Sequence, residues 1–187
     1  MIVVVGESGS GKTSLVNAFC EKHPEYKRVV TYTTRPMREG EVDGIDYNFV
    51  SVDQFKKMIE ENKFVEYNMY RGWYYGTLLD GVDWPLDNVI AVLTPAGLRE
   101  LMRTAKGSHN MTLVSVYLDV DRRSRLIKML KRGDDIEEAY RRNLSDVGQF
   151  DGIEKEVDHR LLNYGYMHTI DDMVFMLEIK LGVRDGI

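Results

Sequence analysis

A glycine-rich segment near the amino terminus has the residue types and spacing of a phosphate-binding loop. Residues 6–13 read GESGSGKT, which fits the pattern G-x-x-x-x-G-K-[ST]. The glycines let the backbone close around an anion, so that the N–H groups of the loop point at a phosphate. Lys12 can place a positive charge between the β- and γ-phosphates, and the Thr13 hydroxyl can bind Mg²⁺. The residues expected to bind ATP, with Mg²⁺ as the cofactor, are Gly6, Glu7, Ser8, Gly9, Ser10, Gly11, Lys12, Thr13 and Ser14.

Such a loop works only between a strand and a helix, and its flanking residues predict both. Residues 1–5 (MIVVV) are an apolar, mostly β-branched run, as in a buried strand. After the loop, Leu15, Ala18 and Phe19 share one face of a helix. The alternative is an ordinary glycine-rich turn, and this context favours the phosphate-binding interpretation.

The composition fits one α/β domain. The chain has 187 residues, of which 43% are hydrophobic, so it can bury a full core. Its 25 Lys and Arg against 30 Asp and Glu give a net charge of −5. We therefore expect no nucleic-acid partner, because no excess of positive charge is present for a phosphate backbone.

Three features predict a cytoplasmic protein without a membrane segment. The lone cysteine, Cys20, excludes an intrachain disulfide and fits a reducing compartment. We expect it to be a small buried hydrophobe. No apolar run reaches the roughly 20 residues that span a bilayer. The phosphate loop starts at residue 6, which leaves no room for a signal peptide.

Hydrophobic periodicity and turn residues predict strands that alternate with helices. The predicted strands are 1–5, 28–31, 47–50, 64–67, 73–77, 88–93, 112–118 and 160–162. The predicted helices are 14–20, 51–62, 95–106, 122–131, 136–150 and 170–181. This order indicates a parallel sheet of about five strands, whose carboxyl ends carry the ligands.

Three segments in the middle of the chain resemble the signature of the guanylate kinase family. They read TYTTRPMREGEVDGIDYNFV (31–50), FVE (64–66) and YYGT (74–77). The similarity is strong over 6–77 and weaker, but in register, to the end. It implies an α/β, three-layer P-loop kinase fold with about five parallel strands. The implied single domain, 1–187, has a core (1–30, 78–121 and 151–187), a small β-rich GMP-binding lobe (31–77) and a helical lid (122–150).

The resemblance also implies which residues bind GMP. Carried over by position, four residues would bind its phosphate and three would read guanine, while Thr94 stands where the family usually has Asp. Arginine binds phosphate bidentately, and a carboxylate such as Glu66 can accept from two guanine donors. Taken alone, these residues also fit a solvated basic turn, packing aromatics and a surface glutamate. The residues implied to bind GMP are Arg35, Arg38, Tyr47 and Tyr75 for the phosphate, and Thr31, Glu66, Thr77 and Thr94 at the base.

In the lid, Arg132 matches an arginine of the family, and Arg142 could supply a second. The resemblance implies four catalytic residues, Lys12, Arg35, Arg132 and Arg142. The chain departs from the family at Lys128 and Asn143, where arginine is usual. It also lacks the usual Asp-x-Asp of the strand end, since 92–97 reads VLTPAG, and its connection 78–88 is short.

The expected function is transfer of the γ-phosphoryl group of ATP to GMP or dGMP, giving ADP and GDP or dGDP. One alternative is a kinase of this family with a different phosphorylated acceptor, which the missing aspartates favour. The other is a non-catalytic guanylate kinase-like binding module, against which the intact loop argues. The expected partners are ATP and GMP, without a membrane, and a monomer or a homodimer is compatible. Bacterial and phage origins both remain open.

Overall fold

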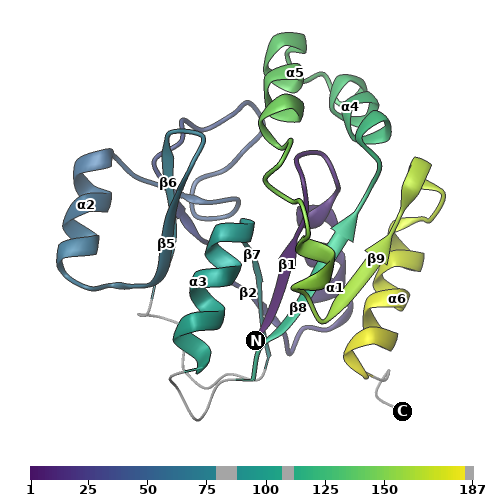
Figure 1. The fold of residues 1–187 in the computed structure, drawn as a ribbon, viewed down its shortest axis with the longest axis horizontal. Helices are drawn as coiled ribbons and strands as arrows, with labels where there is room; N and C mark the ends of the chain where they lie inside the picture. Colours follow the sequence, from purple (N-terminus) through teal and green to yellow (C-terminus); the bar gives the residue numbers. More distant parts are fainter. Residues whose placement is uncertain (79–87, 107–111, 184–187) are drawn as a thin grey trace.

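The larger of two sheets forms the centre of the molecule. The computed structural model describes residues 1–78, 88–106 and 112–183 (Figure 1). The strands of this sheet are β1 (Ile2–Val5), β2 (Lys27–Arg28), β7 (Val89–Val92), β8 (Val114–Asp119) and β9 (His159–Leu162). They lie in the order β2-β7-β1-β8-β9, and every neighbouring pair is parallel. The expected parallel sheet of about five strands is thus confirmed.

Helices cover both faces of this sheet, and the alternation of β1 shows why. Val4 packs into a core formed with α1 (Lys12–Lys22) and α6 (Ile170–Leu181). Val3 and Val5 point to the opposite face, where α3 (Pro95–Lys106) packs. Because both faces of β1 are buried, the strand reads as a continuous apolar run. The resulting three layers confirm the expected fold class.

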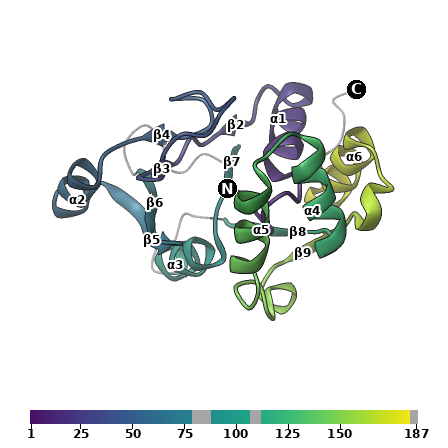
Figure 2. The same cartoon turned by 90° about the horizontal axis from the view of Figure 1, so that it is seen from above.

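A second, smaller sheet lies to one side of this core (Figure 2). It is formed by β3 (Tyr32–Thr33), β4 (Asn48–Phe49), β5 (Phe64–Tyr70) and β6 (Trp73–Leu78), in the order β4-β3-β6-β5. Its helix, α2 (Val52–Glu60), begins at a capping box of Ser51 and Gln54. Phe55 of α2 is fully buried and stacks on Phe64 and Tyr74.

The two-residue turn between β5 and β6 places an arginine at the tip of the hairpin. Arg71 and Gly72 both have positive φ, at 56° and 79°. Two such residues form the tight turn that matches the twist of paired strands. Because Arg71 is not glycine, this conformation is uncommon for it. The turn brings its side chain towards the larger sheet.

Two helices lie in the segment expected to form the lid, α4 (Arg122–Lys131) and α5 (Ile136–Ser145). Asp121 and Asp135 cap their amino ends with side-chain oxygens. The helices are joined by a hydrogen bond of 2.5 Å from Arg122 Nε to Asn143 Oδ1. Asn143 is buried, so this family departure has a packing role.

Some predicted boundaries were wrong. Helix 136–150 ends at Ser145, and the chain turns at Gly148, whose φ is 79°. Of the strand expected at 28–31, only Arg28 lies in a strand, because β2 ends there and β3 of the other sheet starts at Tyr32. Most of the short connection 78–88 lies outside the described residues. Cys20 is only partly buried.

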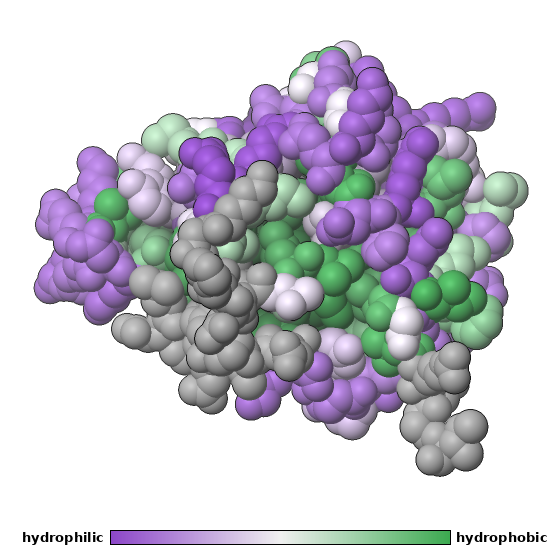
Figure 3. Space-filling view, turned by 60° about the horizontal axis from the view of Figure 1, so that its bottom comes forward, coloured by the Kyte–Doolittle hydropathy of each residue, from purple (hydrophilic) through white to green (hydrophobic). Residues whose placement is uncertain are grey.

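The surface of the small sheet's helix is hydrophilic, as the end that carries α2 shows in Figure 3. Only Phe55 of this helix is buried, and its Lys and Glu side chains face outward. Among residues 1–78, 88–106 and 112–183, no helix is long and apolar enough to cross a membrane.

Phe55 provides a test of how the small sheet is stabilised. Phe55→Ala should lower the free energy of unfolding by about 3–5 kcal/mol, because a large buried side chain leaves a cavity. Phe175→Ala on α6 is the matched control, since Phe175 is 59% exposed and its loss should change stability by less than about 0.5 kcal/mol. Denaturant titration measures both, and equal effects would contradict this packing.

Candidate active site

The phosphate loop joins β1 to α1 as the sequence predicts. Gly11 caps α1 with a φ of 98°, a conformation that favours glycine. Lys12 Nζ donates to Glu7 O at 2.8 Å and lies 3.5 Å from Ser10 Oγ. Burial lowers the pKa of Lys12 to about 8. Lys12 is partly buried and lines the cavity, and an anion bound beside it would raise its pKa again.

The loop forms one end of a cavity of about 1290 Å³ between the two sheets and the lid. Most of the sequence-predicted site residues meet there. The predicted residues that line it are Gly6, Ser8, Gly9, Gly11, Lys12, Thr13, Ser14, Thr31, Arg35, Arg38, Tyr47, Glu66, Tyr75, Thr94, Arg132 and Arg142. The predicted residues outside its lining are Glu7, Ser10 and Thr77. The structure thus brings the predicted ATP and GMP residues to one space.

A carboxylate occupies part of the phosphate loop. Asp146, just after α5, accepts a hydrogen bond of 2.9 Å from the backbone N–H of Ser8. It also accepts from Arg71 Nη2 and Tyr70 Oη, each at 2.6 Å. Arg125 lies 3.4 Å away on its other side. Asp146 is thus a buried anion beside the loop, neutralised by two arginines.

Arg71 connects three parts of the chain. Its Nη2 donates to the Ser8 hydroxyl at 3.1 Å and to the Arg142 carbonyl at 2.6 Å, besides the carboxylate of Asp146. Sequence reasoning missed Arg71, Arg125 and Asp146. The only signal for Arg71 is an arginine at a hairpin turn position that usually holds Asn, Asp or Gly.

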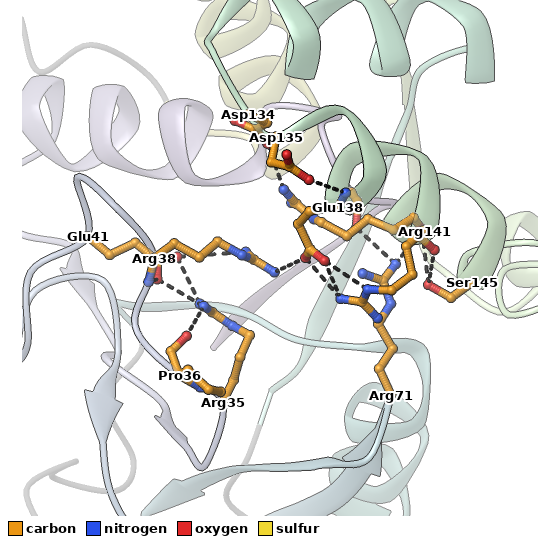
Figure 4. A network of polar contacts seen from close by, with 12 residues as sticks. Arg35, Pro36, Arg38, Glu41, Arg71, Asp134, Asp135, Glu138, Arg141 and Ser145 are labelled. Carbon is orange, nitrogen blue, oxygen red and sulfur yellow. Dashed lines mark hydrogen bonds and ion pairs between the residues drawn. The ribbon is translucent and has the colours of Figure 1, made fainter.

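The two arginines expected at the acceptor phosphate share a glutamate (Figure 4). Arg35 is buried and binds Glu41 bidentately, at 3.0 and 2.8 Å. The Arg38 backbone N–H donates to the same carboxylate at 2.8 Å. The Arg35 guanidinium lies 5.3 Å from the ring centroid of Tyr47, and the Tyr47 and Tyr75 rings are 6.0 Å apart. The expected phosphate residues therefore converge, with Glu41 holding the anionic position.

The lid arginines differ in exposure. The side chain of Arg132 is 62% exposed and pairs with Asp134, whereas Arg142 is buried and donates to Asp134 at 2.9 Å. Burial, together with the charge of Arg38, lowers the pKa of Arg142 to about 10. Both arginines remain cations at neutral pH and face the cavity.

Lys128, a departure from the family pattern, keeps a cation above the phosphate loop. Its ammonium lies 4.1 Å from the ring centroid of Tyr166 and 3.1 Å from the point where a Cβ on Gly11 would lie. A lysine here supplies charge as a point rather than as a planar fork.

At the other end of the cavity, Glu66 is buried on β5. It accepts a hydrogen bond of 2.7 Å from Thr77 Oγ1 and one of 3.3 Å from Asn68 Nδ2. Burial raises the pKa of Glu66 to about 6, because water is lost around the carboxylate. Thr31, also buried, lines the same end. Thr77, which is not part of the cavity lining, thus orients the Glu66 carboxylate by a hydrogen bond.

Thr94 is hydrogen-bonded to Asn68, a residue that sequence reasoning missed. Thr94 Oγ1 donates to Asn68 Oδ1 at 3.2 Å and accepts from the Gly97 N–H at 3.1 Å. Asn68 lies two residues from Glu66, so both side chains share one face of β5. That spacing is the sequence signal that could have identified Asn68.

No group of three or more His, Cys, Asp or Glu side chains suited to a metal ion occurs within the described parts of the chain. Thr13 lines the cavity beside the loop and is exposed, so its hydroxyl is accessible. A Mg²⁺ ion that keeps several waters and binds mainly phosphate oxygens needs few protein ligands. The donor set at Thr13 fits such an ion.

Comparisons with known proteins agree with this geometry. The family model described as "Guanylate kinase" matches residues 1–152. A guanylate kinase of Alkalilimnicola ehrlichii is 32% identical over 177 residues, which are 92% of this chain and 85% of that protein. One of Thermosynechococcus vestitus is 33% identical over 167 residues, or 87% and 85%. A crystal structure of guanylate kinase from Anaplasma phagocytophilum shares the fold, with a TM-score of 0.71 and 17% identity over 97% of this chain and 84% of that chain.

The parallel sheet, the glycine-rich loop and the cationic cavity define a P-loop nucleotide-binding protein of the kinase class. Within this class, the chain belongs to the guanylate kinase family.

Lys12 offers a test of the phosphate end. Lys12→Met should reduce turnover by about 10²- to 10³-fold, because the charge aimed at the transferring group is lost. Its ligand-free melting temperature should not fall, since a desolvated ammonium is removed. ATP affinity, measured by calorimetry, should weaken above about pH 8 in the parent protein as Lys12 deprotonates, and this dependence should vanish in the variant.

Lys57→Ala is the control, because Lys57 is exposed on α2, and it should match the parent protein in every measurement. Near-parental turnover by Lys12→Met would show that the triphosphate binds elsewhere.

Proposed function

We propose that the chain transfers the γ-phosphoryl group of ATP to GMP or dGMP, giving ADP and GDP or dGDP. The observation that carries this proposal is one cavity with a phosphate loop at one end, a buried carboxylate at the other and arginines between them. Membership of the guanylate kinase family agrees with it.

The phosphate loop would bind ATP. Its N–H groups and Lys12 would hold the β- and γ-phosphates, and Thr13 would hold Mg²⁺ with phosphate oxygens. Bound Mg²⁺ supplies neutralisation of the charge on these oxygens. The Ser8 N–H becomes available to a phosphate once Asp146 releases it.

Arg35 and Arg38 would hold the GMP phosphate as the nucleophile, with Tyr47 and Tyr75 as phenolic donors. The fork of Arg35 already binds the two oxygens of Glu41, which is the geometry that a phosphate requires. Transfer in line needs no covalent intermediate and no dedicated base, because the acceptor phosphate is ionised at neutral pH. Catalysis would come from positioning and charge neutralisation.

The lid would complete the site. Arg142 and Arg132 would turn from Asp134 to the transferring phosphoryl group as the lid closes. Closure excludes water, which would otherwise hydrolyse ATP. The division into core (1–30, 78–121 and 151–187), GMP-binding lobe (31–77) and lid (122–150) is part of this proposal.

A different phosphorylated acceptor is the second candidate, because Thr94 replaces the family aspartate. A screen of GMP, dGMP, IMP, AMP and phosphorylated sugars with ATP separates it from the first. Absence of ATP turnover with every acceptor would instead favour a binding module. The cytoplasmic location, the exclusion of nucleic acid and the monomer or homodimer state stay predictions.

Arg35 tests the acceptor site. Arg35→Ala should reduce kcat/KM for GMP by the equivalent of about 2–4 kcal/mol, because a charge-assisted bidentate contact is lost. The Kd for ATP should barely change. Arg103→Ala, on the exposed face of α3, is the matched control. Loss of ATP binding with GMP binding retained would contradict the assignment.

Glu66 tests the base site through pH. Its ionised form accepts from guanine, so kcat/KM for GMP should fall as the pH drops through about 6. The GMP phosphate titrates near pH 6 as well. The acidic limb of log kcat/KM should therefore approach a slope of 2 in the parent protein and 1 in Glu66→Gln. The variant should also lose about ten- to a thousandfold in kcat/KM for GMP, with little change for AMP. Identical acidic limbs in the parent protein and in Glu66→Gln would show that Glu66 does not bind the base.

A further inference from the structure

We propose that Asn68 determines specificity for guanine, because its side-chain carbonyl accepts a hydrogen bond from the 2-amino group beside Glu66. This inference rests on the proposed function. It names a residue whose side chain takes the place of the carboxylate that the family usually has at position 94. Asn68, Glu66 and Thr94 all line the same end of the cavity.

The neighbours of Asn68 determine which way its amide faces. An ionised Glu66 can only accept, so the amide nitrogen must face it, and Nδ2 lies 3.3 Å from Glu66 Oε2. Thr94 Oγ1 accepts from the Gly97 N–H, so its own hydrogen is free to be donated to Asn68 Oδ1. Exchange of the amide oxygen and nitrogen would place two acceptors together at Glu66.

Thr94 has no hydrogen to donate to a base while this network holds. Its only hydrogen is donated to Asn68, and one of its two lone pairs accepts from the Gly97 N–H. Asn68 Oδ1 accepts one hydrogen bond and also has two lone pairs. The second lone pair is an acceptor that the described protein contacts leave unused.

The hydrogens of guanine match this set of acceptors. Guanine presents one hydrogen at N1 and two at the 2-amino group. Glu66 can accept from N1 and from one amino hydrogen, and Asn68 Oδ1 can accept the other. A neutral amide does this without a second negative charge, which would raise the pKa of Glu66 further.

The first turn of α3 holds both side chains in place. A Cβ built on Gly97 would lie 2.8 Å from Glu66 Oε2 and 3.0 Å from Asn68 Nδ2. Only glycine allows the helix to approach this closely. The acceptors are thus positioned before a base binds, which favours discrimination.

Comparison of GMP with IMP tests this directly, because IMP keeps N1–H and lacks the 2-amino group. Asn68→Ala should lower kcat/KM for GMP by about tenfold or more and change that for IMP little, so the GMP/IMP ratio falls. Asn68→Asp keeps an acceptor, so it should keep the GMP/IMP ratio of kcat/KM. Its negative charge should raise the pKa of Glu66, which moves the acidic limb of kcat/KM for GMP to higher pH. Thr94→Val should lower the ratio less than Asn68→Ala, since it only releases the amide. Met69→Ala, 58% exposed on the other face of β5, should leave both values unchanged.

An equal loss for GMP and IMP in Asn68→Ala would overturn the proposal, because it would show that Asn68 only supports Glu66. Calorimetry of GMP and IMP binding to the parent protein and Asn68→Ala separates this inference from the proposed reaction. Binding of GMP without turnover would overturn the kinase assignment, and the GMP/IMP affinity ratio would still decide the role of Asn68. Absence of GMP binding to the parent protein would overturn both.

Discussion

The mutual repulsion of cations around one cavity is the constraint on which the site depends. Arg35, Arg71 and Arg142 are all buried there, and each is neutralised by a carboxylate, of Glu41, Asp146 and Asp134 respectively. Buried guanidinium groups without such partners would be strongly destabilising. The carboxylates thus allow the protein to fold with an anion site already assembled. Under the proposed function, a bound phosphate would take over this neutralisation, so that the ligand-free and liganded states would use the same cations.

The sequence predicts the local features of this molecule well, because short-range physics determines them. The phosphate loop, the buried β1 and the capped α2 each follow from adjacent residues. Boundaries were wrong where tertiary contacts decide, as at the division between β2 and β3, which belong to different sheets. Asp146 escaped prediction for the same reason, since its partner Arg71 is 75 residues away. No periodicity or motif carries information about a contact of that kind.

The end of the cavity around Glu66 departs from the family pattern at Thr94. Glu66 and Thr77 hold positions that the family signature predicts, whereas Thr94 interrupts it. From the sequence alone, Thr94 means the loss of a carboxylate that the family usually has, because a hydroxyl cannot replace it. The structure shows that its hydroxyl holds the amide of Asn68, from the neighbouring element β5. Two residues that lie far apart in the sequence, Asn68 and Thr94, therefore form one hydrogen-bonded unit.

The hairpin of β5 and β6 spans the whole length of the site. One face of β5 carries Glu66, Asn68 and Tyr70, and its turn presents Arg71 to Ser8 of the phosphate loop. The paired strands of this hairpin therefore connect Glu66 directly to the turn that contacts the phosphate loop. Thermodynamic linkage would make any coupling through this hairpin reciprocal: a nucleotide at the loop would change the affinity for the base by the same factor by which the base would change the affinity for the nucleotide. The two ends of the cavity are thus joined by a single supersecondary unit, the hairpin of β5 and β6.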